Sequence, residues 1–471
     1  MKTVLIHLAV LVATLSAAIV HPGCKEEPTQ PPYSVPTPEL HSVAIEPNPH
    51  NVVSAVARIN TSNARFVAVE YGTDSLSLQM TPYATVEGDS VTVPVLGLHA
   101  NTQYFLRGVA VTPGSIVVRG ELQSFTTDTL PGDFPRFTKT FGGNPSPGYV
   151  MLGFNAGSLT QSYAVIIDND ANVVFHRVFA GPVFDFQKHA DGTYTAWARL
   201  TTEQQRFYRM DPLGNILQEY QSTAMEGTGP HEFRQQGTSY VYFGMGFREM
   251  DLTKIGGRVD ARVRGLTVEL FRPPAPEFIW STFDHFLVTD AAPDIDLTGA
   301  TVNPWHGNAI DFDTDGNLLV SFRNSDEITK INSQTGEIIW RLGGRRNQFT
   351  FFNDQFSGFS HQHAIRRLPN GNIILFDNGN LHSPQLSRAV EYSLDETALT
   401  ATLVWEYRPD PPLYGNALGF AQRLANGNTL VCFGPALRII EVDAAGMKQW
   451  EITLEEASRP VYRAFRIDSL Y

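Results

Sequence analysis

Histidines recur at matching points of a repeated pattern in this chain. The clearest copies are Trp305–Ile310, which reads Trp-His-Gly-Asn-Ala-Ile, and Ser360–Ile365, which reads Ser-His-Gln-His-Ala-Ile. With 13 histidines in 471 residues, two such copies in register are not expected by chance. Neutral imidazole is a nucleophile and protonated imidazole is a donor to anions, so clustered histidines suit group-transfer or acid–base chemistry. We therefore expect a functional cluster.

One residue of each repeat occupies the same position, just inside the leading strand. Aligning the repeats on their hairpin turns gives the set Phe184, His231, Asn308, His363, Gly419 and Arg463. His306 and His361 precede two members of the set by two residues. In a radial arrangement of repeats, equivalent positions face a shared central channel. The polar members are therefore predicted to be neighbours around one ligand.

A metal site is an alternative interpretation of the same histidines. Four imidazoles on one axis are a ligand set for zinc or copper, with His231, His306, His361 and His363 as ligands. The two cysteines, Cys24 and Cys432, and the absence of paired Cys-x-x-Cys motifs exclude a thiolate zinc site and a disulfide framework. We favour a site without metal or other cofactor.

Short strands joined by tight turns must position this cluster. One repeat runs from Ile328–Asn332 to Ile338–Trp340, and the next hairpin turns at Asn370-Gly371-Asn372. Two hairpins make a four-stranded blade, and six such units between Tyr163 and Tyr471 predict a six-bladed β-propeller, with strand Tyr149–Phe154 closing the ring. The expected fold class is all-β.

Three segments precede the propeller, which is assigned to residues 131–471. Residues 1–24 have the layout of a signal peptide, because Lys2 is followed by an uncharged, mostly apolar run. Residues 25–40 form a proline-rich linker. Alternating runs in residues 41–130 predict a small β-sandwich. Its Leu98–Tyr104 stretch resembles the tyrosine corner of fibronectin type III domains.

The signal segment predicts export to the periplasm or to the outer membrane or surface of a bacterial cell. Gly23-Cys24 resembles a bacterial lipoprotein signal, in which a lipidated Cys24 tethers the protein to a membrane. Ordinary cleavage after Ser16-Ala17-Ala18 is the alternative. Whether the sandwich also mediates a homodimer is left open.

Charge argues against nucleic acid as a partner. Asp and Glu number 48 against 35 Lys and Arg, which gives a formal net charge of −13. Such an excess of negative charge opposes nonspecific contacts with phosphates. The partners we expect are small molecules.

The region from Trp305 to Gly434 contains a series of motifs in a fixed order. They are His306-Gly307-Asn308-Ala309-Ile310, Thr335–Gly344, Gln362-His363, Phe376–Gly379 and Ser387-Arg388. In these motifs and their order the chain resembles the bacterial arylsulfate sulfotransferases, also called arylsulfotransferases. The likeness begins at about Phe134 and runs to the end of the chain. The resemblance implies transfer of a sulfuryl group from an aryl sulfate donor to a phenolic acceptor through a histidine intermediate in the propeller channel, without a nucleotide donor.

The resemblance also implies roles for individual residues. His363 is expected to be the nucleophile, His306 and Arg388 to hold sulfate oxygens, and His361 to transfer protons. Further substrate contacts are expected from His231, Asn308, Asn378 and Arg463. Sulfuryl transfer, like phosphoryl transfer, needs in-line geometry and cationic donors around three equatorial oxygens.

One departure from the family pattern leaves a second hypothesis open. The sulfate-accepting histidine of the family aligns with Tyr414–Gly419, where this chain has no histidine. Either His363 or His361 takes that role, or the protein is a non-catalytic exported propeller that binds sulfated or acidic ligands.

Overall fold

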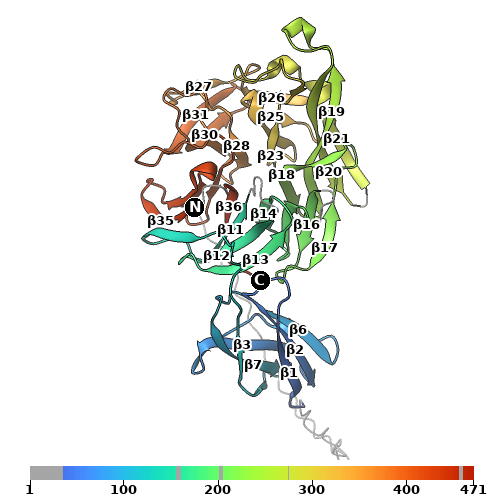
Figure 1. Ribbon diagram of the computed structural model, residues 1–471, viewed down its shortest axis with the longest axis vertical. Coiled ribbons are helices and arrows are strands. Elements are labelled where there is room, and N and C mark those ends of the chain that lie inside the picture. Colours follow the sequence, from blue (N-terminus) through green and yellow to red (C-terminus); the bar gives the residue numbers. More distant parts are fainter. Residues whose placement is uncertain (1–35, 155–160, 201–204, 274, 456–459) are drawn as a thin grey trace, which may run out of the picture.

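A closed ring of β-sheets and a smaller β body beside it make up the molecule (Figure 1). The computed structural model describes residues 36–154, 161–200, 205–273, 275–455 and 460–471. The predicted signal peptide and residues 25–35 of the predicted linker lie outside these ranges. The only α-helix among the described residues is α1 (Thr282–His285), and no described helix has the length and apolar character to cross a membrane. The all-β prediction is confirmed.

Six sheets of the described residues between Phe137 and Ile467 form the ring. Each begins at the axis with one inner strand. The inner strands are β14 (Phe184–Lys188), β18 (Gly227–Gln236), β23 (Gly307–Phe312), β28 (His363–Arg367), β32 (Phe420–Arg423) and β36 (Val461–Ile467). Each inner strand contacts the next one along the chain, and β36 contacts β14. The six sheets are therefore the blades of a closed propeller, as the repeats predicted.

The remaining strands extend each blade outward in chain order, except where a distant segment joins. The blade that begins with β14 continues with β15 (Tyr194–Ala198), β16 (Arg206–Met210) and β17 (Ile216–Tyr220). The β18 blade continues with β19 (Ser239–Met250), β20 (Ala261–Arg272) and β21 (Ala275–Ser281), and β22 (Thr301–Val302) pairs with β20. The β23 blade continues with β24 (Leu318–Phe322), β25 (Glu327–Ile331) and β26 (Ile338–Gly343). The β28 blade continues with β29 (Ile373–Asp377), β30 (Arg388–Asp395), β31 (Thr400–Tyr407) and β27 (Thr350–Phe352). The β32 blade continues with β33 (Thr429–Cys432), β34 (Arg438–Val442), β35 (Lys448–Leu454) and β10 (Phe137–Gly142). The β36 blade continues with β11 (Tyr149–Phe154), β12 (Ser162–Ile167) and β13 (Val173–Phe179).

Strands from both ends of the propeller sequence close the ring. The predicted closing strand β11 pairs antiparallel with β36, with Tyr149 opposite Ile467. In the neighbouring blade, β10 pairs antiparallel with β35, with Phe137 opposite Leu454. Pairing of this kind satisfies backbone groups that would otherwise form exposed sheet edges. The predicted closure is confirmed.

Tryptophans at matching outer positions join neighbouring blades. The indole Nε1–H of Trp280 donates to the carbonyl oxygen of Gly336 in the next blade at 3.0 Å, and that of Trp450 donates to the carbonyl oxygen of Asn169 at 2.9 Å. Both tryptophans are buried. Each such bond contributes about 1 kcal/mol net, in addition to the burial of the ring.

The smaller body is a β-sandwich of two sheets. One sheet contains β1 (Glu39–Pro47), β2 (Ala55–Ser62) and β6 (Ser90–Val95). The other contains β3 (Phe66–Asp74), β4 (Ser77–Met80), β5 (Ala84–Thr85), β7 (Gln103–Val111), β8 (Val117–Arg119) and β9 (Gln123–Thr126). The hydroxyl of Tyr104 accepts the backbone N–H of His99 at 2.9 Å, the contact expected of a tyrosine corner.

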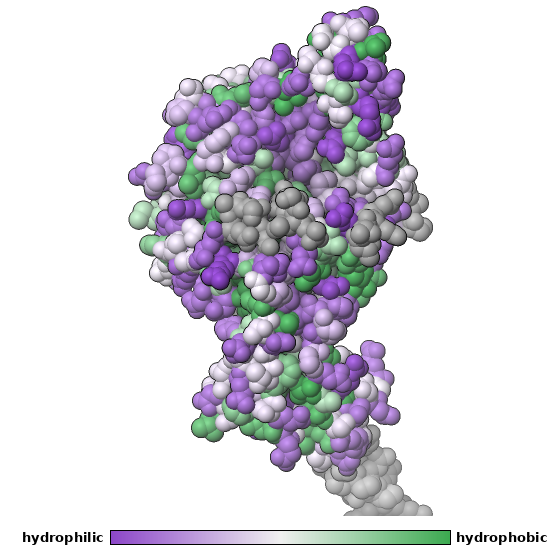
Figure 2. All heavy atoms as spheres, viewed as in Figure 1, coloured by the Kyte–Doolittle hydropathy of each residue, from purple (hydrophilic) through white to green (hydrophobic). Residues whose placement is uncertain are grey.

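The sandwich sits against the rim of the propeller near β12 and β13, below a narrow waist (Figures 1 and 2). The Tyr471 hydroxyl accepts the backbone N–H of Leu96 at 3.1 Å, and the Asn48 amide donates to the carbonyl oxygen of Leu213 at 2.8 Å. These contacts lie at the rim, whereas the histidines lie at the inner strands. The sandwich therefore contributes no side chain to the histidine cluster.

Candidate functional site

Three of the predicted histidines meet at the propeller axis. The ring centroids of His231 and His306 are 4.8 Å apart. Burial, followed by neighbouring positive charge, lowers the pKa of His306 to about 3 and lowers the pKa values of His231 and His363 well below their ordinary range. Each of the three imidazoles is close enough to perturb another electrostatically. The cluster is therefore a set of neutral imidazoles in a site that favours anions.

The hydrogen bonds of His363 fix the position of its proton. Its Nδ1 lies 2.7 Å from Oδ1 of Asn378 and 3.1 Å from the carbonyl oxygen of His361. The Asn378 amide nitrogen donates to the carbonyl oxygens of Gly415 and Leu418, so the orientation of this amide is determined. Nδ1 must therefore carry the proton. The Nε2 lone pair accepts the Leu418 N–H at 3.2 Å.

The proton of His231 is fixed in the same way by a tyrosine. The Tyr462 hydroxyl donates to the carbonyl oxygen of His231 at 2.8 Å, and its oxygen lies 3.1 Å from His231 Nδ1. Because a carbonyl oxygen can only accept, the hydroxyl hydrogen is used there and Nδ1–H must donate to the tyrosine oxygen. The Nε2 of His231 is therefore unprotonated.

His306 is held by the turn that leads into β23. Its backbone has a φ of +47°, in the left-handed region, and its carbonyl oxygen accepts the backbone N–H of Arg323 at 3.0 Å. Its Nδ1 lies 2.9 Å from the side-chain amide of Asn303. The preceding Trp305 is buried and donates its indole N–H to the carbonyl oxygen of Leu287 at 3.1 Å. These contacts anchor the turn that presents the imidazole.

The structure does not bring Arg388 into this cluster. Arg388 is the first residue of β30 and is completely buried. Its five N–H donors contact Asp377 at 2.9 Å, Asp354 at 3.0 Å through two nitrogens, Glu406 at 2.9 Å and the carbonyl oxygen of Gly358 at 2.8 Å. These partners raise its pKa. No donor remains for a sulfate oxygen, which corrects the role that the resemblance implied for this arginine.

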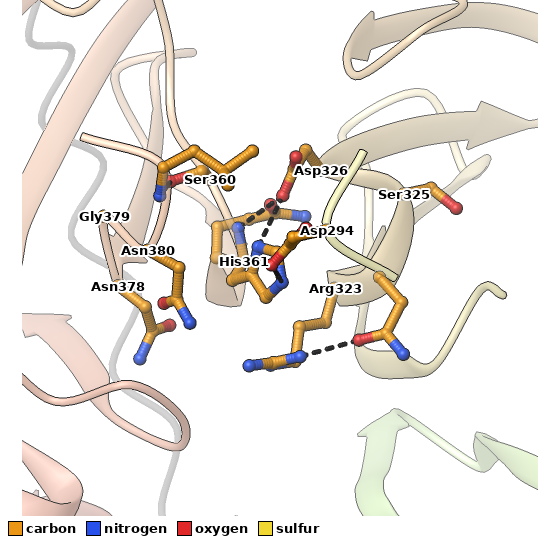
Figure 3. Close-up of polar contacts among 12 residues, drawn as sticks. Asp294, Arg323, Ser325, Asp326, Ser360, His361, Asn378, Gly379 and Asn380 are labelled. Atoms are coloured by element: carbon orange, nitrogen blue, oxygen red, sulfur yellow. Dashed lines mark hydrogen bonds and ion pairs between the residues drawn. The ribbon is translucent and has the colours of Figure 1, made fainter. Parts of the chain in front are cut away.

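Two other arginines, which the sequence did not single out, supply the positive charge. Arg323 follows β24 directly, and the pairing of Gly307 with Phe322 places it beside His306. It makes two hydrogen bonds, to Asn324 Oδ1 and to the carbonyl oxygen of Asn416, and its buried Nε has no partner. Figure 3 shows its guanidinium reaching toward the blade of Asn378. The cross-strand register is the signal that would have identified Arg323.

The side chain of Arg264, on β20, lacks a hydrogen bond or ion pair to any described residue. Its Nε is buried without a partner, and burial lowers its pKa. It lines a cavity of about 150 Å³ together with His231 and His306. A guanidinium with free donors beside two neutral imidazoles is suited to bind a sulfate, phosphate or carboxylate group.

His361 lies between two carboxylates. Its Nδ1 lies 3.0 Å from Asp326, and its Nε2 lies 3.2 Å from Asp294 (Figure 3). The His361 side chain is buried, whereas that of Asp294 is 41% exposed. Nε2 is therefore paired with Asp294, whereas Nδ1 lies close to Asp326 without a hydrogen bond. The predicted proton transfer by His361 would have to pass through Asp294 to reach solvent.

Arg463 and Asn308 belong to a buried network across the axis. Arg463 donates to Asp185 at 2.7 Å, to Glu232 at 3.0 Å and to the carbonyl oxygen of Asn308 at 2.7 Å. Arg366 adds two further bonds to Glu232, both at 3.0 Å. The Asn308 amide donates to the carbonyl oxygen of Gln362 at 2.7 Å. The network ties inner strands together and occupies the Asn308 amide nitrogen and both terminal nitrogens of Arg463, whereas Asn308 Oδ1 and Arg463 Nε are buried without a partner.

A larger cavity of about 690 Å³ lies at the opposite ends of β14, β32 and β36. Its basic groups are engaged: Lys188 donates to the carbonyl oxygen of Ser469 at 2.8 Å, and Arg466 pairs with Glu441 at 2.8 Å. The smaller cavity is lined by His231, His306 and the unpaired Arg264, whereas His363 and Arg323 are not among its lining residues. We therefore assign anion binding to the smaller cavity. In the described part of the chain, no group of three His, Cys, Asp or Glu residues is arranged to hold a metal ion.

Comparison with known proteins gives one family match. Residues 249–463 match the family model described as Arylsulfotransferase (ASST). This range contains His306, Arg323 and His363 but not His231. The sequence matches no curated protein.

The solved structures that match this chain share little sequence with it. A protein of unknown function from Bacteroides caccae is 12% identical, with 69% of this chain and all of that chain covered and a TM-score of 0.45. An inactive virginiamycin B lyase from Staphylococcus aureus is 10% identical, with 71% and 100% covered and a TM-score of 0.37. Over residues 249–463 the chain is thus similar to the arylsulfotransferases, and this likeness supports aryl sulfotransfer in general.

Proposed function

We propose that this protein is an aryl sulfate sulfotransferase in which His363 accepts the sulfuryl group. The observation that carries the proposal is the fixed tautomer of His363, with the proton on Nδ1 and a lone pair on Nε2. The Leu418 N–H occupies that lone pair at 3.2 Å, so this contact must break as Nε2 bonds to sulfur. Neutral imidazole of this kind is the form that attacks an electrophile. The low pKa that burial imposes keeps it neutral across the physiological range.

In the first half-reaction, Nε2 of His363 bonds to sulfur while the bond from sulfur to the aryl oxygen breaks. The electron pair of that bond leaves with the phenolate. In the second half-reaction, the oxygen of the acceptor phenol attacks sulfur, the nitrogen–sulfur bond breaks, and the phenol proton passes to solvent. His363 is then neutral again, so the reaction follows ping-pong kinetics.

The positive charge for this transfer comes from Arg323, in place of Arg388. Charge builds up on the equatorial sulfuryl oxygens and on the leaving oxygen, and preorganised cationic donors stabilise it. Arg323 perturbs both His306 and His363 electrostatically and keeps unused donors. His306 contributes its imidazole beside them. The Tyr414–Gly419 stretch supplies the Leu418 N–H that contacts His363, so its role in this chain is to hold the nucleophile.

The test uses para-nitrophenyl sulfate as donor and phenol as acceptor. We expect release of para-nitrophenolate that depends on phenol, and loss of that release in His363→Ala. His41→Ala, which changes an exposed histidine of the sandwich, is the matched control and should retain full activity. Mass spectrometry of protein quenched without acceptor should show one added SO3 group on the peptide that contains His363.

Two outcomes would refute the proposal. Release that is unchanged in His363→Ala would exclude this nucleophile. Calorimetric binding of the aryl sulfate with no release at any protein concentration would instead support the non-catalytic binding hypothesis.

A further inference from the structure

A third cavity, of about 340 Å³, adjoins the one lined by Arg264 and has the opposite charge character. Its polar lining includes Gln221, Ser222 and Glu226, and no Lys, Arg or His lines it. Glu226 is exposed and has no hydrogen bond or ion pair to any residue in the described part of the chain. The nearby Glu269, in contrast, is buried and accepts hydrogen bonds from Ser222 and Thr223. Glu226 is therefore a free carboxylate in the wall of this cavity.

The two cavities share a wall that suits an aromatic ring. Trp197, Gln205 and Met245 line both of them. Trp197 is fixed, because its indole N–H donates to the carbonyl oxygen of Thr228 at 3.0 Å and its ring packs edge-on against Phe184 at 5.6 Å. An indole face and a thioether are favourable neighbours for a flat aromatic ligand. A ligand that follows this wall has one end beside Arg264 and the other beside Glu226.

We propose that the substrate is an aryl sulfate, or an acceptor phenol, whose ring carries a protonated amine. The sulfuryl end enters beside Arg264, His231 and His306, from where it must reach His363 at the start of the adjoining inner strand β28. The ring packs on Trp197 and Met245, and the ammonium group pairs with Glu226. This inference rests on the proposed sulfotransfer. It adds a charge preference that neither the imidazoles nor the family likeness supplies.

The experiment compares three acceptors with para-nitrophenyl sulfate as the common donor. They are para-(aminoethyl)phenol, its neutral analogue para-(hydroxyethyl)phenol, and the anionic para-hydroxyphenylacetate. In the wild-type protein we expect kcat/KM for the amine to exceed that for the neutral acceptor by about twofold to fivefold, the range of an exposed ion pair, with the anion lowest. Added salt should shrink this preference because it screens the pair.

Glu226→Gln keeps the size of the side chain and removes its charge, so the ratio of amine to neutral acceptor should fall to about one. Glu249→Gln, at an exposed position of β19 that lines neither cavity, is the matched control and should keep the wild-type ratio. Equal kcat/KM values for all three acceptors, or an amine preference that survives in Glu226→Gln, would overturn the inference while leaving sulfotransfer intact. No transfer to any acceptor would instead refute the proposed function on which it rests.

Discussion

The imidazoles of His231 and His306 lie with their centroids 4.8 Å apart, in a site where burial already lowers both pKa values. Stability should therefore depend on these histidines in acid. The pKa of His306 falls from 6.5 to about 3 on folding, so below pH 6.5 the unfolded chain binds a proton that the folded chain does not. The free energy of unfolding should fall as the pH drops from 6.5 toward 3.

His306→Asn removes this titration, so its pH dependence between these limits should be shallower than that of the wild type. Denaturant unfolding at several pH values measures the difference between the two proteins. His41→Asn, at an exposed site, should leave the wild-type dependence unchanged. Parallel curves for wild type and His306→Asn would show that His306 is not neutral in the folded protein.

Asn378 should act as a positioning residue for His363. Asn378→Ala removes the shorter of the two acceptors of the Nδ1 proton and leaves the His361 carbonyl oxygen at 3.1 Å. The imidazole is then held less firmly and spends more time in the tautomer with the proton on Nε2, which has no lone pair for sulfur. We expect kcat to fall by about 100-fold or more while KM changes little, by analogy with other losses of tautomer control. Steady-state kinetics with para-nitrophenyl sulfate separates the two constants.

A merely structural role for Asn378 would give another pattern. Loss of folded protein would lower the apparent kcat in proportion to the active fraction, which active-site titration measures, and would leave the pH profile unchanged. Asn215→Ala, in an exposed hairpin turn where Asn215 contacts Asp211, is the control for removal of an asparagine. An Asn378→Ala protein with wild-type kcat per active site would contradict the predicted tautomer control.

Arg323 and Arg388 should respond in opposite ways to the same substitution. Arg388→Gln leaves Asp354 and Asp377 buried without their cation, so we expect a loss of about 3–5 kcal/mol in the free energy of unfolding. Arg323→Gln removes a guanidinium with few internal bonds. It should lower kcat/KM by about 100-fold and change stability by less than about 1 kcal/mol. Paired denaturation and kinetic measurements check both; normal stability of Arg388→Gln together with lost activity would restore its catalytic role.

The buried axial network should show strong coupling between Arg463 and Asp185. Arg463→Met leaves Asp185 and Glu232 short of positive charge, and we expect a loss of about 3–5 kcal/mol. Adding Asp185→Asn should recover part of this loss, so the double-variant cycle should give a non-additive term. Burial already raises the pKa of Asp185, so the defect of Arg463→Met should shrink as the pH falls and the carboxyl binds a proton. Additive losses would mean that the pair is not coupled.

The blade architecture could be predicted from sequence because its signals are local. Turns such as Asn370-Gly371-Asn372 require the positive φ found at Gly371, 87°, and alternating apolar residues mark the strands beside them. The same periodicity placed His231, His306 and His363 at the axis. Even the closure through Tyr149–Phe154 follows from an unpaired strand at each end of the repeats.

The roles of the arginines could not be predicted, because the ion-pair partner of an arginine can lie far from it in the sequence. Arg388 forms an ion pair with Asp354, which lies 34 residues earlier in the sequence. Nothing in the motif around Arg388 indicates that contact. Arg264 is unpaired for the converse reason, since no described carboxylate folds against it. Whether an arginine is free or engaged depends on tertiary contacts, whereas its presence at a strand end is visible in the sequence.

Binding of inorganic sulfate should be accompanied by proton uptake. The free site contains imidazoles kept neutral by burial and by Arg323 and Arg264. A bound dianion offsets that positive charge and stabilises the protonated form of His306, so its pKa rises on binding. By linkage, the affinity for sulfate must then increase as the pH falls. Isothermal titration calorimetry in buffers of different ionisation enthalpy measures the protons taken up per sulfate. His306→Asn should take up fewer protons, and an affinity that stays constant between pH 8 and pH 5 would contradict a site built from neutral imidazoles.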